Sequence, residues 1–318
     1  MTEERPEPKP DPRAIRAAVA EALAADGLTQ GALARQAGVS ATTVSQFLSD
    51  TYRGDVAGVA ARLARWLADR AETAALPAAL TREVLAETGV KAAIWSKLRL
   101  THHLGGMCMV ALKPGLGKTC TARAYAGAHN NVWLATMLAG AGSETMALRT
   151  ISGDLGLTWH GGEGVLELNR QLCARLEGRE GLLIVDEAQH LRPEGLEAVR
   201  QLHDKARVGV ALLGHAELGG VVRGLKQLDS RMAWRLEGAE LDAGDVALVA
   251  EAFGVTAAPS LDLLEGCAGG EGGLRDVVNT LRRAWEIAFA HGRPVAHEDV
   301  AAAVVDRAPP RDATAGGR

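Results

Sequence analysis

Residues 107–119 read Met-Cys-Met-Val-Ala-Leu-Lys-Pro-Gly-Leu-Gly-Lys-Thr, and residues 182–187 read Leu-Leu-Ile-Val-Asp-Glu. The first stretch is an apolar run, a glycine-containing turn and Lys-Thr, the pattern by which a strand delivers backbone N–H groups to nucleotide phosphates at a helix N-terminus. The second stretch is a buried strand that ends in two carboxylates, which can supply a Mg²⁺ ligand and a base that orients water. In this order, the two stretches predict binding and hydrolysis of ATP.

Each position of the expected phosphate loop has a separate task. Gly115 and Gly117 permit a close approach of backbone to phosphate that a side chain would obstruct. Lys118 should reach the β- and γ-phosphates, and the Thr119 hydroxyl should bind Mg²⁺. Leu112 departs from the usual pattern, which has glycine there, and predicts an altered entry into the loop rather than lost binding. The residues expected to bind the nucleotide here are Pro114, Gly115, Leu116, Gly117, Lys118, Thr119 and Cys120.

Other polar residues complete a hydrolytic site. Asp186 is expected to complete the Mg²⁺ shell through water, and Glu187 to polarise the attacking water. Hydrolysis also needs groups that sense and stabilise the γ-phosphate. His215 follows an expected strand and could bind the γ-phosphate or the water, or it could be an ordinary surface histidine. Arg275 begins an expected helix and could reach the phosphates as that helix closes over them.

Arg231 and Arg235 lie four residues apart and would share one face of a helix. An arginine at this point typically reaches the γ-phosphate of a neighbouring subunit, and either residue could do so. The alternative is a solvated helix face. An arginine that acts in trans implies oligomerisation. Arg282 and Arg283 are expected on the surface or facing DNA.

The arrangement of apolar runs predicts an α/β P-loop ATPase core in which a parallel sheet is covered by helices on both faces. Strands are expected near 107–112, 131–137, 181–186, 207–213 and 236–241. Helices are expected near 245–253, 259–267, 273–290 and 297–306. We therefore assign the core to 89–243, a helical lid to 244–307 and a disordered tail to 308–318.

The first 72 residues are expected to form an all-α helix-turn-helix domain, with a disordered start over 2–12 and a linker over 73–88 that includes a possible helix cap at Thr81. Thr29 and Ser40 are N-cap candidates for two short helices around a turn at Gly38. The second helix, followed by another over about 55–71, turns small hydrogen-bonding side chains outward, as a helix that contacts DNA does. The alternative is a helical bundle for protein contacts. The candidate DNA-binding residues are Thr42, Thr43, Ser45 and Gln46.

Charge and composition narrow the class of protein. The 318 residues carry a formal net charge of −4, which argues against a uniformly basic nucleic-acid binder. Residues 1–72 hold nine basic and ten acidic side chains, so their isolated binding to DNA should be weak. Residues 73–131 hold seven basic and two acidic side chains. The first ten residues lack an apolar stretch, so we expect no signal peptide, and the sequence has no apolar run of membrane-spanning length. The four cysteines have no metal-ligand spacing, so we expect a cytoplasmic protein with reduced thiols.

Together these residues resemble AAA+ ATPases that assist DNA transposition, most closely the B transposition proteins of Mu-like phages and prophages. The resemblance covers nearly the whole chain. It is carried by Ser-Gln-Phe-Leu-Ser-Asp-Thr-Tyr-Arg-Gly-Asp at 45–55, Arg65-Trp66-Leu67, Ile94-Trp95-Ser96, Asn130-Asn131-Val132-Trp133, Gly181 to Leu191, and the arginines already named. His215 departs from these relatives, which usually carry a polar amide or hydroxyl at that position.

The resemblance implies a mechanism and partners. The ATP-bound protein would polymerise on double-stranded DNA as a homo-oligomer or helical filament, largely without regard to sequence. That assembly would capture target DNA and activate a cognate transposase, which would in turn trigger ATP hydrolysis and release. The location implied is the cytoplasm of the bacterial host.

Two other functions fit part of the sequence. The N-terminal helices would also suit a transcriptional regulator that reads an operator and carries a nucleotide-responsive ATPase module. The strand over 181–186, followed by Glu187-Ala188-Gln189-His190, also suits a secretion- or partition-type ATPase. The lack of an apolar membrane segment weighs against the secretion type.

Overall fold

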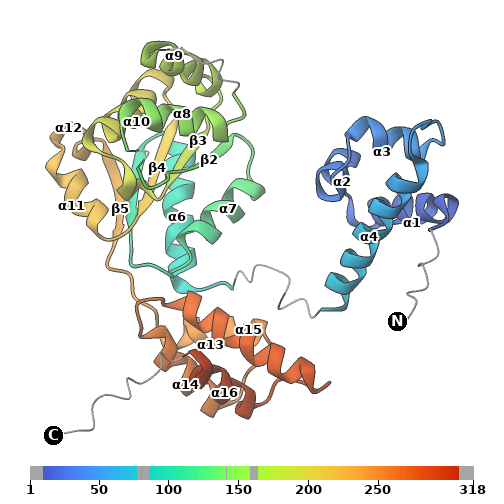
Figure 1. Cartoon of the computed structure of the whole chain (residues 1–318). Helices are drawn as coiled ribbons and strands as arrows, with labels where there is room; N and C mark the ends of the chain where they lie inside the picture. Colours follow the sequence, from blue (N-terminus) through green and yellow to red (C-terminus); the bar gives the residue numbers. More distant parts are fainter. Residues whose placement is uncertain (1–9, 77–79, 81–85, 141, 158–163, 308–318) are drawn as a thin grey trace, which may run out of the picture. The chain divides into compact units, whose positions relative to one another are not determined.

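The structure, a computed structural model, describes residues 10–76, 80, 86–140, 142–157 and 164–307. The chain divides into two compact units, residues 1–82 and 83–318 (Figure 1). The described helices include none that is both long and apolar enough to cross a bilayer. Thr81 and the expected tail over 308–318 lie outside the described residues.

The first unit is a small helical bundle with its own core. Its helices are α1 (Pro12–Asp26), α2 (Gln30–Ala37), α3 (Ala41–Leu48) and α4 (Val56–Ala75). Thr29 caps α2 and Ser40 caps α3, while Gly38 takes the left-handed conformation, with φ of 65°, in the turn between them. The apolar residues that close the bundle are fully or nearly buried, and they include Val19, Leu33, Val44, Phe47, Leu63 and Trp66.

Two boundaries of this unit correct the expectations from sequence. The expected tail over 2–12 is wrong at its end, because Asp11 accepts a hydrogen bond from the backbone N–H of Arg13 and begins α1. Helix α4 runs on to Ala75, so it takes up the first residues of the expected linker. An N-cap aspartate and an alanine-rich run both favour helix, and they outweigh the proline-rich and polar neighbours.

The second unit is built on a five-stranded parallel sheet with strand order β2-β3-β4-β1-β5. The strands are β1 (Met107–Ala111), β2 (Val132–Thr136), β3 (Leu182–Asp186), β4 (Gly209–Gly214) and β5 (Met232–Glu237). The expectation of a strand over 236–241 is wrong by four residues. As an edge strand, β5 consists of half-buried and exposed residues, Arg235 among them, instead of forming a continuous buried apolar run.

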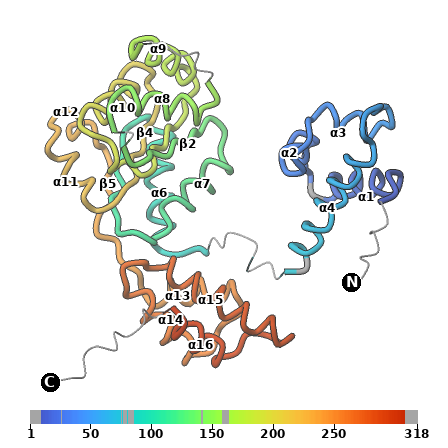
Figure 2. The backbone as a smooth tube through the Cα atoms, viewed as in Figure 1, coloured from blue at the N-terminus to red at the C-terminus, as the bar shows by residue number. Residues whose placement is uncertain are grey.

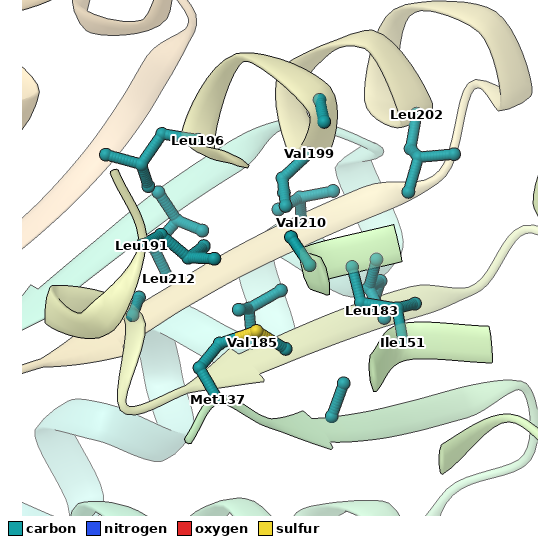
Figure 3. Close-up of a cluster of buried hydrophobic side chains, with 14 of the residues drawn as sticks. Met137, Ile151, Leu183, Val185, Leu191, Leu196, Val199, Leu202, Val210 and Leu212 are labelled. Carbon is teal, nitrogen blue, oxygen red and sulfur yellow. The ribbon is translucent and has the colours of Figure 1, made fainter. Parts of the chain in front are cut away.

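Helices cover both faces of the sheet, which confirms the predicted α/β class. One face packs against α6 (Gly89–Leu104) and α7 (Lys118–Ala128). The other packs against α8 (Glu144–Asp154), α9 (Val165–Leu176), α10 (Pro193–Ala206), α11 (Glu217–Gly224) and α12 (Lys226–Asp229). In Figure 3, Leu196, Val199 and Leu202 of α10 lie over Val210 and Leu212 of β4. This core fixes the carboxyl ends of the strands, where Asp186 ends β3 and His215 follows β4.

Four helices follow the sheet, and Figure 2 traces the chain from β5 into them. They are α13 (Ala243–Ala252), α14 (Ala258–Ala268), α15 (Leu274–Ala290) and α16 (His297–Arg307). Val277, Leu281 and Ala284 lie at helical spacing on α15 and are fully buried. This buried stripe holds α15 against its neighbours and leaves another face of the helix for the site described below.

Candidate nucleotide site

The loop between β1 and α7 has the geometry that a phosphate loop requires. Gly115 and Gly117 have φ of 74° and 81°, which glycine adopts without steric cost. A Cβ at Gly115 would also lie 1.7 Å from the carbonyl oxygen of Gly272, so no side chain fits there. The Lys118 ammonium donates to the carbonyl oxygens of Leu112 and Lys113, both at 2.9 Å.

Leucine at position 112 is accommodated by the core. Its backbone N–H donates to the carbonyl oxygen of Gly214 at 3.1 Å, which continues the pairing of β1 with β4. Its side chain is 1% exposed and belongs to the cluster beneath the loop, together with Leu116 and Val110. The carbonyl of Leu112 remains directed to Lys118, so the loop forms without a glycine at this point.

A hydroxyl and a carboxylate meet at the start of α7. The Thr119 hydroxyl donates to Oδ2 of Asp186 at 2.7 Å, and Asp186 is fully buried at the end of β3. Burial raises the pKa of Asp186, while the hydrogen bonds from Thr119 and the Glu187 N–H act against that rise. Mg²⁺ takes oxygen ligands and usually binds through one or two protein groups together with phosphates and water. The pair Thr119 and Asp186 fits that ion.

A cavity of about 240 Å³ extends from this point between the phosphate loop and the C-terminal helices. It brings together nearly all the residues predicted to contact nucleotide. The lining residues from the loop and strands are Pro114, Gly115, Gly117, Lys118, Thr119, Cys120, Glu187 and His215. The others are Ala86, Thr88, Lys91, Val249, Leu274, Arg275, Val278, Asn279 and Arg282. Of the predicted contacts, Leu116 is 5% exposed and packs in the core instead.

Among the basic side chains that line the cavity, Lys118 and Arg275 interact with each other. The pKa of Lys118 is lowered first by burial, and the positive charge of Arg275 lowers it further, against the opposite effect of Glu187 and Asp186. A polyanion placed between Lys118 and Arg275 would relieve this repulsion and stabilise both charges. The cavity therefore suits a nucleoside triphosphate. A second hollow of about 330 Å³, lined in part by Glu240 and Glu265, adjoins the cavity at Pro114, which lines both, but includes neither Lys118 nor Thr119.

Glu187 and His215 face each other across the mouth of the cavity. Glu187 has a φ of 55°, a left-handed conformation that non-glycine residues adopt infrequently. Its backbone N–H donates to Oδ1 of Asp186 at 3.0 Å. Its Oε2 lies 3.9 Å from Nε2 of His215, too far for a direct hydrogen bond but close enough for one water to contact both.

Arg231 and Arg235 lie apart from the cavity and do not share a helix face. The expectation of a helix is wrong, because the chain enters β5 at Met232. Nε of Arg231 lies 3.0 Å from Oδ1 of Asp204, and the Arg231 side chain is 47% exposed. The Arg235 guanidinium donates to both the carboxylate and the backbone carbonyl of Asp229, at 2.7 and 3.1 Å.

One cavity residue was assigned elsewhere from sequence. Arg282 was expected on the surface or facing DNA, but it lines the cavity. Arg275, Val278, Asn279 and Arg282 follow the spacing of one helix face, and that spacing could have indicated the site. Arg283, one residue further round α15, forms an exposed ion pair with Asp306 instead.

The four residues predicted to bind DNA lie in the other unit, on α3. Thr42, Ser45 and Gln46 are exposed, whereas Thr43 is half-buried. The Thr43 hydroxyl lies 2.7 Å from the Ser40 hydroxyl, within the hydrogen bonds that cap the helix. Three of the four side chains are thus available for contacts with a partner.

Comparison with known proteins shows to which class of ATPase the chain belongs. The chain matches the AAA domain family over residues 101–222 and the family of the C-terminal part of the Mu B transposition protein over 230–306. It is similar in fold to ORC2 of Aeropyrum pernix, with a TM-score of 0.56 and 20% identity over 74% of this chain and 73% of that chain. It is also similar to Cdc6p of Pyrobaculum aerophilum, with a TM-score of 0.56 and 17% identity over 72% and 70% of the two chains. Fold and site together define an AAA+ ATPase.

Two relatives specify the family. The ATP-dependent target DNA activator B of Escherichia phage Mu is 32% identical over 287 residues, which cover 88% of this chain and 91% of the relative. The DNA transposition protein B of the Mu-like prophage FluMu of Haemophilus influenzae is 31% identical over 278 residues, which cover 82% and 94%. The chain belongs to the Mu B transposition protein family.

Proposed function

We propose that this protein is an ATP-regulated DNA-binding ATPase that assembles on double-stranded DNA, captures it as a transposition target and activates a partner transposase. One observation carries the proposal. The cavity in which Lys118 and Arg275 converge beside Asp186 and Glu187 occurs in a chain 32% identical to an ATP-dependent target DNA activator.

The chemistry follows from the residues around the cavity. Backbone N–H groups of the phosphate loop, together with Lys118 and Arg275, hold the phosphates of ATP. Thr119 and Asp186 would hold Mg²⁺, which neutralises charge on the phosphate oxygens. Glu187 orients the attacking water and accepts its proton, while His215 contacts the water or the γ-phosphate.

The C-terminal helices act as a lid that responds to nucleotide. Arg275 begins α15, and the loop just before it contacts the phosphate loop, where the carbonyl oxygen of Gly272 lies against Gly115. Binding of a triphosphate attracts Arg275 and so draws α15 toward the core. This movement sets the surface that a neighbouring subunit meets, so that assembly depends on ATP.

An arginine from the neighbouring subunit completes the site. Arg231 is better placed for this role than Arg235, because its side chain is more exposed, 47% against 31%. Arg235 is fixed by both the side chain and the backbone of Asp229, as a structural residue would be. Hydrolysis would then require contact between subunits.

Assembly also explains how a chain with a net charge of −4 binds DNA. Single subunits offer few phosphate contacts, and the exposed Thr42, Ser45 and Gln46 on α3 add hydrogen bonds of low individual strength. Many such contacts act together when subunits are aligned along one duplex. The resulting binding is largely independent of sequence and strongly dependent on salt.

The test compares DNA binding and electron micrographs of the protein with ATP, with ADP and without nucleotide. We expect assemblies on DNA with ATP alone, and none from Lys118→Ala under any condition. Equal binding by monomers in all three states would overturn the proposal.

A second function is motivated by the N-terminal bundle. Two short helices around Gly38, with polar side chains outward on the second, also suit a regulator that reads an operator. That function requires a defined footprint on one palindromic sequence and a stable dimer in solution. A footprint without sequence preference excludes it.

A further inference from the structure

The side chain of Gln189 connects the two polar residues at the mouth of the cavity. Gln189 lies in the short 3₁₀ turn Ala188–His190 that follows β3. Its Nε2 donates to Oε2 of Glu187, and its Oε1 accepts the backbone N–H of His215 at 3.2 Å. These partners fix the orientation of the amide, because a carboxylate needs a donor and a backbone N–H needs an acceptor.

The side-chain amide of Gln189 lies close to the backbone of Gly214. Gly214 ends β4, and a Cβ there would lie 2.6 Å from Oε1 of Gln189 and 2.9 Å from Cδ2 of Leu218. A side chain at position 214 would therefore displace the Gln189 amide or the end of the Leu218 side chain. The amide is seated between the ends of β3 and β4, which are adjacent parallel strands of a rigid sheet.

We propose that Gln189 is a positioning residue that holds the Glu187 carboxylate toward the cavity and links it to the end of β4 that carries His215. The inference rests on the proposed role of Glu187 as the base. A hydrogen bond to an ionised carboxylate is short and comparatively strong, so it can hold a flexible side chain in one rotamer. Because the same amide is bonded to His215, a shift of either residue is transmitted to the other.

Two variants of similar length separate the two hydrogen bonds. Gln189→Met loses both, while Gln189→Glu keeps the acceptor for the His215 N–H but loses the donor and places a second carboxylate against Glu187. We expect both to lower kcat for DNA-stimulated ATP hydrolysis by about 10- to 100-fold, since small displacements of a reacting group have effects of that size. Affinity for ATP and ATP-dependent DNA binding should change by less than about twofold, because neither contact involves the phosphates.

Gln227→Met serves as the matched control, since Gln227 is exposed on α12. A double-variant cycle supplies the decisive comparison. In a Glu187→Gln background, substitution of Gln189 should produce no further loss of hydrolysis, because the carboxylate that it positions is already absent. Melting temperatures of all variants establish that each is folded.

The outcomes are distinct. A parental rate for Glu187→Gln would contradict the role of Glu187 itself. A parental rate for Gln189→Glu, with Glu187→Gln inactive, would overturn the positioning role alone. Weaker ATP binding by both Gln189 variants, or an equal further loss in the Glu187→Gln background, would show that Gln189 only supports the loop and would also overturn the inference.

Discussion

At the scale of a single residue, Lys118 is a buried cation whose surroundings disfavour its positive charge. It is buried at 6% exposure, yet its ammonium must remain available to an anion. The carbonyls of Leu112 and Lys113 hold it in the loop, while burial and Arg275 lower its pKa. A triphosphate between the two cations would favour the charged form of Lys118 and relieve its repulsion from Arg275, so nucleotide binding stabilises a site that is electrostatically unfavourable without it.

Replacement of Lys118 by alanine should therefore abolish nucleotide binding. We expect Lys118→Ala to weaken the affinity for ATP by about 100-fold or more, because a buried charged partner of the phosphates is lost. Equilibrium binding of a fluorescent ATP analogue measures this. Lys113→Ala is the control, since Lys113 lies in the same loop but is exposed, and it should change affinity only slightly. Unchanged affinity of Lys118→Ala would mean that the loop does not bind phosphates.

Glu187 can be tested without disturbing nucleotide binding. Glu187→Gln should retain ATP affinity but lower hydrolysis by about 100-fold or more, because the water loses its base. DNA complexes formed with ATP should consequently persist far longer than those of the parental protein. Single-turnover hydrolysis and complex lifetimes give the two readouts. Glu194→Gln, at an exposed position on α10, is the control. Turnover by Glu187→Gln at the parental rate would assign the base elsewhere.

At the scale of elements, one carboxylate joins α13 to α6. Asp242 and Asp245 form a capping box at the start of α13. Oδ1 of the buried Asp245 also accepts the backbone N–H of Gly89, at the start of α6, at 2.6 Å. Thr88, the N-cap of α6, lines the nucleotide cavity together with Val249 of α13. The hydrogen bond between Asp245 and Gly89 thus holds together α6 and α13, which line two sides of the cavity.

Removal of this carboxylate should loosen both elements. We expect Asp245→Ala to lower the free energy of unfolding of this unit by about 1–2 kcal/mol, because the hydrogen bonds that its carboxylate accepts from the N–H groups of Gly89 and Asp242 are both lost. Asp262→Ala, at an exposed position within α14, should change it by less than about 0.5 kcal/mol. Urea unfolding followed by circular dichroism makes the comparison. Equal effects of the two variants would show that the Asp245 contacts contribute nothing.

The same elements show what sequence can predict. The strand, turn and helix around Gly115 and the strand that ends in Asp186 were predicted correctly, because each is a local pattern of a few consecutive residues. The start of β5 was misplaced, because an edge strand such as Met232–Glu237 has no continuous apolar run. The contact of Gln189 with His215 could not be predicted, since only the tertiary fold brings the two residues near, whereas the place of Arg282 could have been inferred from its helical spacing to Arg275.

At the scale of the whole molecule, hydrolysis is expected to need two subunits. Mixing two inactive variants tests this. Arg231→Ala lacks the arginine offered to a neighbour, while Glu187→Gln lacks the base of its own site. In an equal mixture, random head-to-tail pairing should restore about a quarter of the parental rate. Arg170→Ala, at an exposed ion-paired position, should hydrolyse ATP normally on its own. Absence of any recovery would contradict action of Arg231 in trans.

The most direct test of the central claim is the size of the protein–DNA complex as a function of nucleotide, measured by sedimentation at constant salt with ATP, ADP or none. We predict large assemblies along the duplex with ATP, their disappearance with ADP, and none from Lys118→Ala. Complexes of the same size under all three conditions would contradict the account.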